Sequence, residues 1–148
     1  QLQHEDYQVR ALAAWGLGEI KDAATLPHLY AALQDPHVKV RVNAIESIGD
    51  HKQTDSAPFI MPLLRDPEWR VRREAIKVLV EIESRGAVPD IIAALQDEER
   101  RVREAAASAL GNLGDARAIP ALSAALHDVS VDVRKEAADA LGEIYEEK

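Results

Sequence analysis

Apolar residues recur along this chain at the three- and four-residue spacing of amphipathic helices. One such helix, helix A, is predicted from Glu98 to Leu113, and its apolar stripe consists of Val102, Ala106, Ala109, Leu110 and Leu113. Gly114 and Asp115 end it. A shorter helix B follows with Pro120 in its first turn, where a missing N–H costs little, and its stripe consists of Ile119, Leu122 and Leu126. The pattern predicts an antiparallel helical hairpin.

The same hairpin returns every 31 residues, and a valine-arginine pair marks each copy. The pairs are Val9-Arg10, Val40-Arg41, Val71-Arg72, Val102-Arg103 and Val133-Arg134. Other columns keep this register: proline at Pro27, Pro58, Pro89 and Pro120, aspartate at Asp35, Asp66, Asp97 and Asp128, and glycine at Gly18, Gly49, Gly111 and Gly142. A fixed period of this length indicates stacked copies of one supersecondary unit.

The predicted fold class is therefore all-α, an α-solenoid of about four and a half hairpins in a right-handed superhelical array. We place the repeats at residues 5–35, 36–66, 67–97 and 98–128, with a half repeat at 129–148, in a single domain of residues 1–148. Helices B are expected on the inner, concave face. Only one Phe, two Trp and three Tyr are present, so small side chains must let the helices approach closely.

Two runs carry a resemblance to a known family. DVSVDVRKEAADALGEI, from Asp128 to Ile144, and DARAIPALSAALHD, from Asp115 to Asp128, resemble the HEAT-like repeats of the phycobilisome-lyase (PBS lyase) type. The resemblance covers essentially the full chain. It implies an α-solenoid used mainly for contact between proteins, while a minority of members act on bilin chromophores or on other proteins. The fold itself does not choose among these roles.

The resemblance also allows two enzyme classes to be tested against the residues. Deoxyhypusine hydroxylase is a HEAT-like protein whose di-iron site uses His-Glu pairs just after the Val-Arg pairs, and the corresponding positions here carry no histidine. The one adjacent pair, His4-Glu5, precedes the first predicted helix. HEAT-like DNA glycosylases need a basic concave channel, which this acidic chain does not obviously supply. We expect no metal and no cofactor.

The formal charge of −8 disfavours nucleic acid and anionic membranes as partners, because both attract clustered Lys and Arg. A basic cluster from Arg70 to Arg101 is interleaved with acids and is interpreted as a solvated face, although binding of nucleic acid there stays open. There is no Cys, no signal-peptide pattern, and no apolar run near the roughly 20 residues that cross a bilayer. These features favour a cytoplasmic protein without membrane contact.

The repeated Asp and Arg columns suggest a catalytic site at first sight, but the copies are equivalent and a site is normally built once. We therefore predict a structural role, in which each Arg hydrogen-bonds aspartates or helix ends across neighbouring repeats. Each Asp is also expected to be the N-cap of the next helix A. The pairs considered are Asp35/Arg41, Asp66/Arg72, Asp97/Arg103 and Asp128/Arg134.

Function is then sought where one repeat departs from the others. The inner ridge of the B helices carries His28, Phe59, Asp90 and Ala121 in turn, above small residues. Phe59, between His28 and Arg65, is a candidate anchor for a peptide or helix, or it fills space in an irregular second repeat. That repeat has a polar turn from His51 to Asp55 and a Pro62 that should kink its helix B and bring local curvature or mobility.

The leading functional hypothesis is a non-catalytic scaffold that binds a protein or peptide segment on its concave helix-B face. The residues proposed for this contact are His28, Phe59, Arg65 and Asp90. The alternative is a lyase-like subunit that handles a bilin or related chromophore together with a partner subunit.

A second contact patch is predicted at Ala11, Leu12 and Trp15, because the other repeats carry polar residues in the column of Trp15. This patch is open to four interpretations: coverage by the segment around Leu2, a missing upstream repeat, self-association, or a partner site.

Overall fold

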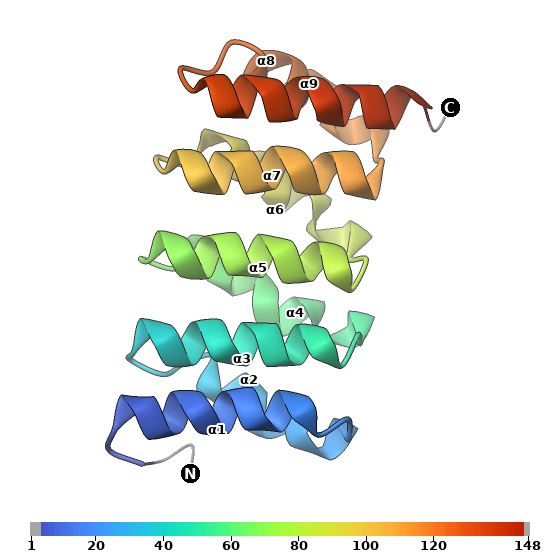
Figure 1. Cartoon of the computed structure of the whole chain (residues 1–148). Coiled ribbons are helices and arrows are strands. Elements are labelled where there is room, and N and C mark those ends of the chain that lie inside the picture. The colour runs from blue at the N-terminus through green and yellow to red at the C-terminus, as the bar shows by residue number, and fades with distance from the viewer. Residues whose placement is uncertain (1–3, 147–148) are drawn as a thin grey trace. The chain divides into compact units, whose positions relative to one another are not determined.

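The structure is a computed structural model that describes residues 4–146, and within that range it contains helices and turns but no strand (Figure 1). The chain divides into two compact units, Gln1–Ile82 and Glu83–Lys148. The described residues form five A helices and four B helices. The predicted all-α solenoid is confirmed, whereas its right-handed sense and its organisation as a single domain stay predictions.

The first unit contains three A helices and two B helices. Its A helices are α1 (Tyr7–Glu19), α3 (Val38–Asp50) and α5 (Trp69–Glu81), and its B helices are α2 (Leu26–Ala32) and α4 (Ala57–Ile60). Short 3₁₀ turns at Ala23–Thr25, Thr54–Ser56 and Met61–Arg65 complete it. Helix α3 packs between α1 and α5, and α2 packs across α3 (Figure 1).

The second unit repeats this arrangement with two A helices and two B helices. The A helices are α7 (Arg100–Leu113) and α9 (Val131–Glu146), and the B helices are α6 (Val88–Ala93) and α8 (Ile119–Ala125), with 3₁₀ turns at Arg85–Ala87, Ala94–Gln96 and Ala116–Ala118. Helix α7 lies beside α9, and α8 packs on α9. Among residues 4–146, no helix is both long and apolar enough to cross a bilayer.

Glycine lets neighbouring A helices approach closely. A Cβ atom placed on Gly18 of α1 would lie 2.9 Å from the Cα of Ser47 on α3. A Cβ on Gly111 of α7 would lie 2.8 Å from the Cα of Ala140 on α9. Real Cβ atoms do not come this close to backbone, so the repeated glycine of the sequence is explained by contact between helices.

The B helices are short, as the sequence predicts. Helices α2 and α8 have seven residues each. In the second repeat α4 ends at Ile60, and the chain continues as the 3₁₀ turn that contains Pro62. This break agrees with the predicted kink, because proline removes a backbone donor.

Candidate protein-binding surfaces

The repeated arginine and aspartate form what we call the Arg–Asp ladder, defined by the pairs Arg10–Asp35, Arg41–Asp66 and Arg103–Asp128. In each pair the arginine Nε donates to Oδ2 at 2.7–2.9 Å and Nη2 donates to Oδ1 at 3.1 Å. Nη1 bonds the backbone just before the arginine's own helix, as Arg41 donates to the backbone oxygen of Asp35 at 2.8 Å. The predicted structural role of these columns is confirmed.

The ladder corrects the N-cap prediction for the aspartates. Asp35 Oδ1 accepts from the N–H of His37, and His37 is the cap of α3, where its Nδ1 accepts from the N–H of Lys39. Asp66 bonds the N–H of Glu68 in the same way. The expectation was wrong by two residues, because these carboxylates are turned toward the arginine that lies 25 residues earlier in the chain.

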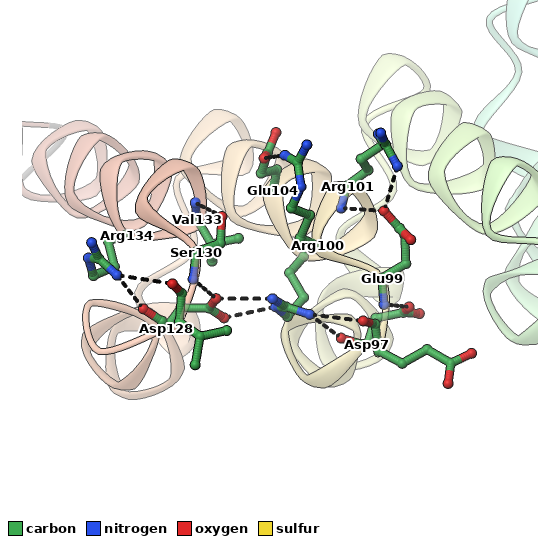
Figure 2. A network of polar contacts seen from close by, with 12 residues as sticks. Asp97, Glu99, Arg100, Arg101, Glu104, Asp128, Ser130, Val133 and Arg134 are labelled. Carbon is green, nitrogen blue, oxygen red and sulfur yellow. Dashed lines mark hydrogen bonds and ion pairs between the residues drawn. The ribbon is translucent and has the colours of Figure 1, made fainter.

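The ladder sets the charge of its acids. Burial alone would raise the pKa of Asp128, but the hydrogen bonds from Arg103 and from the Ser130 N–H outweigh it, so this pKa lies below its usual value. The contacts of Ser130 and Arg134 around Asp128 are drawn in Figure 2. For Asp35 too, the bonds from Arg10 and from the His37 N–H outweigh burial and lower the pKa. Asp35 and Asp128 therefore stay ionised, and their carboxylates serve as acceptors in the structural hydrogen bonds of the ladder.

On the helix-B side of the first unit, two aromatic rings form one surface. Phe59 stacks on Tyr30 with ring centroids 3.9 Å apart and planes 5° apart. Tyr30 is fixed by a 2.7 Å hydrogen bond between its hydroxyl and the Ser56 Oγ. Because Tyr30 covers only one face of the ring, Phe59 stays 49% exposed. Tyr30 was not among the predicted contact residues, although its place as an aromatic residue on the adjacent helix B was an available signal.

The other predicted members of this surface are distributed over both units. His28 is exposed on α2, and Arg65 is exposed at the end of the 3₁₀ turn Met61–Arg65. Asp90 is half-buried on α6 in the second unit. We define the Phe59 surface as His28, Tyr30 and Phe59; the common surface with Arg65 and Asp90 stays a prediction.

The polar turn of the second repeat is anchored by its own side chains. His51 Nδ1 lies 2.9 Å from the Ser47 oxygen, and its Nε2 lies 3.0 Å from the Thr25 Oγ1. Thr54 donates to the oxygen of Ile82 at 3.0 Å. Lys52 takes a φ of 54°, in the left-handed region that favours glycine. The predicted mobility of this turn stays a prediction.

A second exposed patch lies on α1. Leu12 and Trp15 are both exposed, and they line a hollow of about 460 Å³ with Gln8, Lys39 and Asn43. Ala11 lies buried beneath the patch, where its backbone oxygen accepts from the Asn43 amide at 2.9 Å. The proposed cover around Leu2 lies outside the described residues.

Acids gather on the other side of Trp15. A hollow of about 230 Å³ is lined by Trp15, Glu46, Ser47, Asp50, Glu74, Lys77, Val78 and Glu81. Burial, together with the nearby charge of Glu74 and its hydrogen bond, raises the pKa of Glu46. Among residues 4–146, no group of three or more His, Cys, Asp or Glu has the geometry of a metal site.

The basic cluster carries ion pairs along its helices. Arg70 lies 3.4 Å from Glu68, Lys77 lies 3.5 Å from Glu74, and Arg100 lies 3.0 Å from Glu104. The three basic side chains are between 46% and 58% exposed. These contacts support the interpretation as a solvated face.

The repeated hairpins and their Arg–Asp ladder define the class of this protein as an α-solenoid of helical repeats. The family model for HEAT repeats matches residues 1–68 and 57–142. The chain belongs to the HEAT-repeat family, and the resemblance to the phycobilisome-lyase type is confirmed. No curated protein matches the chain.

Solved structures extend this result. A chain of the complex of CpcE and CpcF of phycocyanin lyase from Nostoc sp. is 27% identical with a TM-score of 0.84, and the match covers 98% of this chain and 62% of that one. An engineered protein is 22% identical with a TM-score of 0.68, covering 97% and 76%. Human deoxyhypusine hydroxylase in complex with glycerol is 18% identical with a TM-score of 0.57, covering 98% and 82%. The last two similarities show the fold alone.

Proposed function

We propose that this chain is a non-catalytic HEAT-repeat scaffold that binds a protein or peptide segment through the Phe59 surface. The observation that carries the proposal is the stack of Phe59 on Tyr30. Tyr30 holds one face of the ring in place, and about half of the Phe59 surface area stays open to a partner. An aromatic side chain that is ordered before binding loses little entropy when a partner covers it, which favours it as an anchor.

Neighbouring side chains define the segment that fits. Exposed Pro58 and Pro62 flank the ring in sequence, and exposed His28 lies on the adjacent helix B. These residues give the surface an apolar centre with a polar edge. We expect an apolar side chain of the partner to cover Phe59, with polar groups of the partner near His28. The predicted cytoplasmic location is part of the same proposal.

A random peptide library selected on the full chain tests this proposal. Peptides should be recovered that bind the native chain and bind Phe59→Ala at least tenfold more weakly. Val129→Ala is the matched control, since Val129 is 92% exposed and distant in sequence from the Phe59 surface. Selected peptides that bind Phe59→Ala and the native chain alike would contradict the proposal. Phe59→Leu separates the loss of the ring from the loss of apolar area.

A lyase-like role is the second candidate, and the similarity to a chain of the phycocyanin lyase complex favours it. In this role the chain would handle a bilin or related chromophore together with a partner subunit. This chain spans 62% of the length of that chain, so the role is a proposal with a test of its own. The absorbance spectrum of a bilin should change when the chain is added with a partner subunit, and an unchanged spectrum would count against this role.

A further inference from the structure

Two arginines of α5 stack on the same indole ring. The guanidinium carbon of Arg70 lies 4.7 Å from the centroid of the Trp69 ring, and that of Arg73 lies 5.0 Å from it. Since both distances end at one centroid, the two guanidinium groups lie within about 10 Å of each other. Stacking uses the face of a guanidinium and leaves the N–H donors at its edge available. We call Trp69, Arg70 and Arg73 the α5 arginine cluster.

The equivalent positions of α7 hold an arginine in a different way. There Arg100 stands in the column of Trp69, and it forms an ion pair at 3.0 Å with Glu104 (Figure 2). Glu104 stands in the column of Arg73 and neutralises the arginine that it binds. In α5 the uncharged indole orders Arg73 instead, and no carboxylate among residues 4–146 forms an ion pair with this arginine. The positive charge of Arg73 is therefore ordered without being neutralised.

The acids nearest in sequence leave the cluster with an excess of positive charge. The Nη1 of Arg70 lies 3.4 Å from the Oε1 of Glu68, which is long for a hydrogen bond, and the Arg70 side chain is 58% exposed. Glu74 is buried and pairs with Lys77 at 3.5 Å. Arg73 is half-buried, so part of its side chain stays open to solvent. The cluster can thus receive an anion from outside.

We infer that the α5 arginine cluster binds an acidic segment of a partner protein. Carboxylates match the edge donors of guanidinium groups in bidentate pairs. Two acids close in sequence fit this spacing, since residues four apart on a helix or two apart on a strand lie about 5–7 Å from each other. The segment therefore carries two Asp or Glu within four positions. This inference goes beyond the proposed function, because it concerns a second surface, on a helix A.

A nucleic acid fits the cluster less well than a short acidic segment. Further along α5, one hollow is lined by four acids, which are Glu46, Asp50, Glu74 and Glu81. Burial and the charge of Glu74 raise the pKa of Glu46, so negative charge is already crowded there. A nucleic acid carries phosphates along its whole length and would be repelled by these acids, whereas a short segment contacts only the two arginines. The formal charge of −8 acts in the same direction.

A fluorescein-labelled hexaglutamate peptide is the probe, and labelled hexaglutamine is its control. Fluorescence anisotropy with the full chain at low ionic strength should show saturable binding of hexaglutamate alone, and added salt should weaken it. Arg73→Gln should bind at least fivefold more weakly. Arg73→Lys keeps the charge without the planar fork and should bind at least twofold more weakly. Lys135→Gln should bind like the native chain and is the matched control, because Lys135 occupies the column of Arg73 but has Val131 in place of the indole.

Trp69 gives a second readout of the same binding. In a Trp15→Phe chain Trp69 is the one remaining tryptophan, and its emission should change as hexaglutamate binds. Trp69→Leu should weaken binding at least threefold while its circular dichroism spectrum stays helical. If Trp69→Leu does not fold, the emission of Trp69 and the two Arg73 variants decide the outcome.

Three outcomes would overturn the inference. Equal weakening in Arg73→Gln and Lys135→Gln would show that binding follows the overall charge. Saturable binding with an unchanged emission of Trp69 would place the site elsewhere. Tighter binding of a single-stranded oligothymidylate than of hexaglutamate, with a loss in Arg73→Gln, would assign the cluster to nucleic acid. Phe59→Ala should leave hexaglutamate binding unchanged, so failure here and failure of the proposed function are distinguishable.

Discussion

Arg41 binds Asp66 through two parallel hydrogen bonds, Nε to Oδ2 at 2.9 Å and Nη2 to Oδ1 at 3.1 Å, although 25 residues separate them. The side chains are only 13% and 5% exposed. The pair therefore ties α3 to the segment that leads into the following helix A, α5, inside a region largely shielded from water. Breaking such a pair leaves a partly buried charge without its partner, which is costly.

Arg41→Gln should lower the free energy of unfolding by about 3 kcal/mol, because Asp66 would lose both bonds to its carboxylate. Arg70→Gln is the control, since the Arg70–Glu68 pair is exposed and should contribute less than about 0.5 kcal/mol. Urea unfolding followed by circular dichroism measures both. Equal losses for the two variants would contradict a structural role for the ladder.

Gly111 and Gly142 occupy the same position in successive repeats, but substitution by alanine should change the stability of the chain in opposite directions at the two sites. Gly111→Ala should destabilise by about 1–3 kcal/mol, because the new methyl group would overlap Ala140. Gly142→Ala should stabilise by about 0.5–1 kcal/mol, because it meets open space and alanine favours the helix. Thermal unfolding of the two variants gives the signs, and a shift of the same sign in both would refute the packing argument.

Acid should weaken the protein through its ladder aspartates. The pKa of Asp128 is lower in the folded chain than in the unfolded one, because the bonds from Arg103 and Ser130 outweigh burial. The unfolded state thus takes up protons first, so this contribution is complete above about pH 4 and is lost as the pH falls through the folded value. Asp128→Asn should give a smaller loss of stability between pH 5 and pH 2 than the native chain shows. A steeper loss of stability in Asp128→Asn than in the native chain would show that folding does not lower the pKa of Asp128.

Protonation of Glu136 should favour the folded state, in contrast to protonation of Asp128. Burial and the charges of Asp139, Glu104 and Glu143 raise its pKa above the usual value. The folded state therefore binds this proton more readily, and the contribution of Glu136 becomes more favourable as the pH falls toward its raised pKa. Glu136→Gln should stabilise the chain at pH 7 by a few tenths of a kcal/mol. A loss of stability at pH 7 would show that the carboxylate has a favourable contact instead.

The sequence predicts the architecture well because every repeat carries the same columns. The Val-Arg period alone indicates the α-solenoid, and the equivalence of the pairs indicates that the arginines are structural. It does not predict that Arg10 binds an aspartate 25 residues later, because that pairing depends on how one hairpin is placed on the next. The N-cap of α3 was predicted at Asp35 but lies two residues later, at His37. The sequence does not reveal this shift, because it does not show that Asp35 binds Arg10.

The surface residues are harder to predict, since exposure depends on helix rotation and on long-range contacts. Phe59 was singled out from the sequence, but Tyr30, 29 residues earlier, gives it a fixed orientation. Ala11 was grouped with Leu12 and Trp15, yet it is buried, and its backbone oxygen accepts from the Asn43 amide of α3. Arg134 looks equivalent to Arg10, Arg41 and Arg103 in sequence, and only the structure shows that no carboxylate among residues 4–146 accepts from its Nε or Nη2.

The most direct test of the proposed function is the affinity of one selected peptide for three forms of the chain. Isothermal titration should give Kd values for the native chain and Val129→Ala that agree within a factor of two. Phe59→Ala should bind at least tenfold more weakly, which corresponds to about 1.4 kcal/mol, while its circular dichroism spectrum stays helical. Equal Kd values for all three forms would show that partners bind elsewhere and would contradict the Phe59 surface as the binding site.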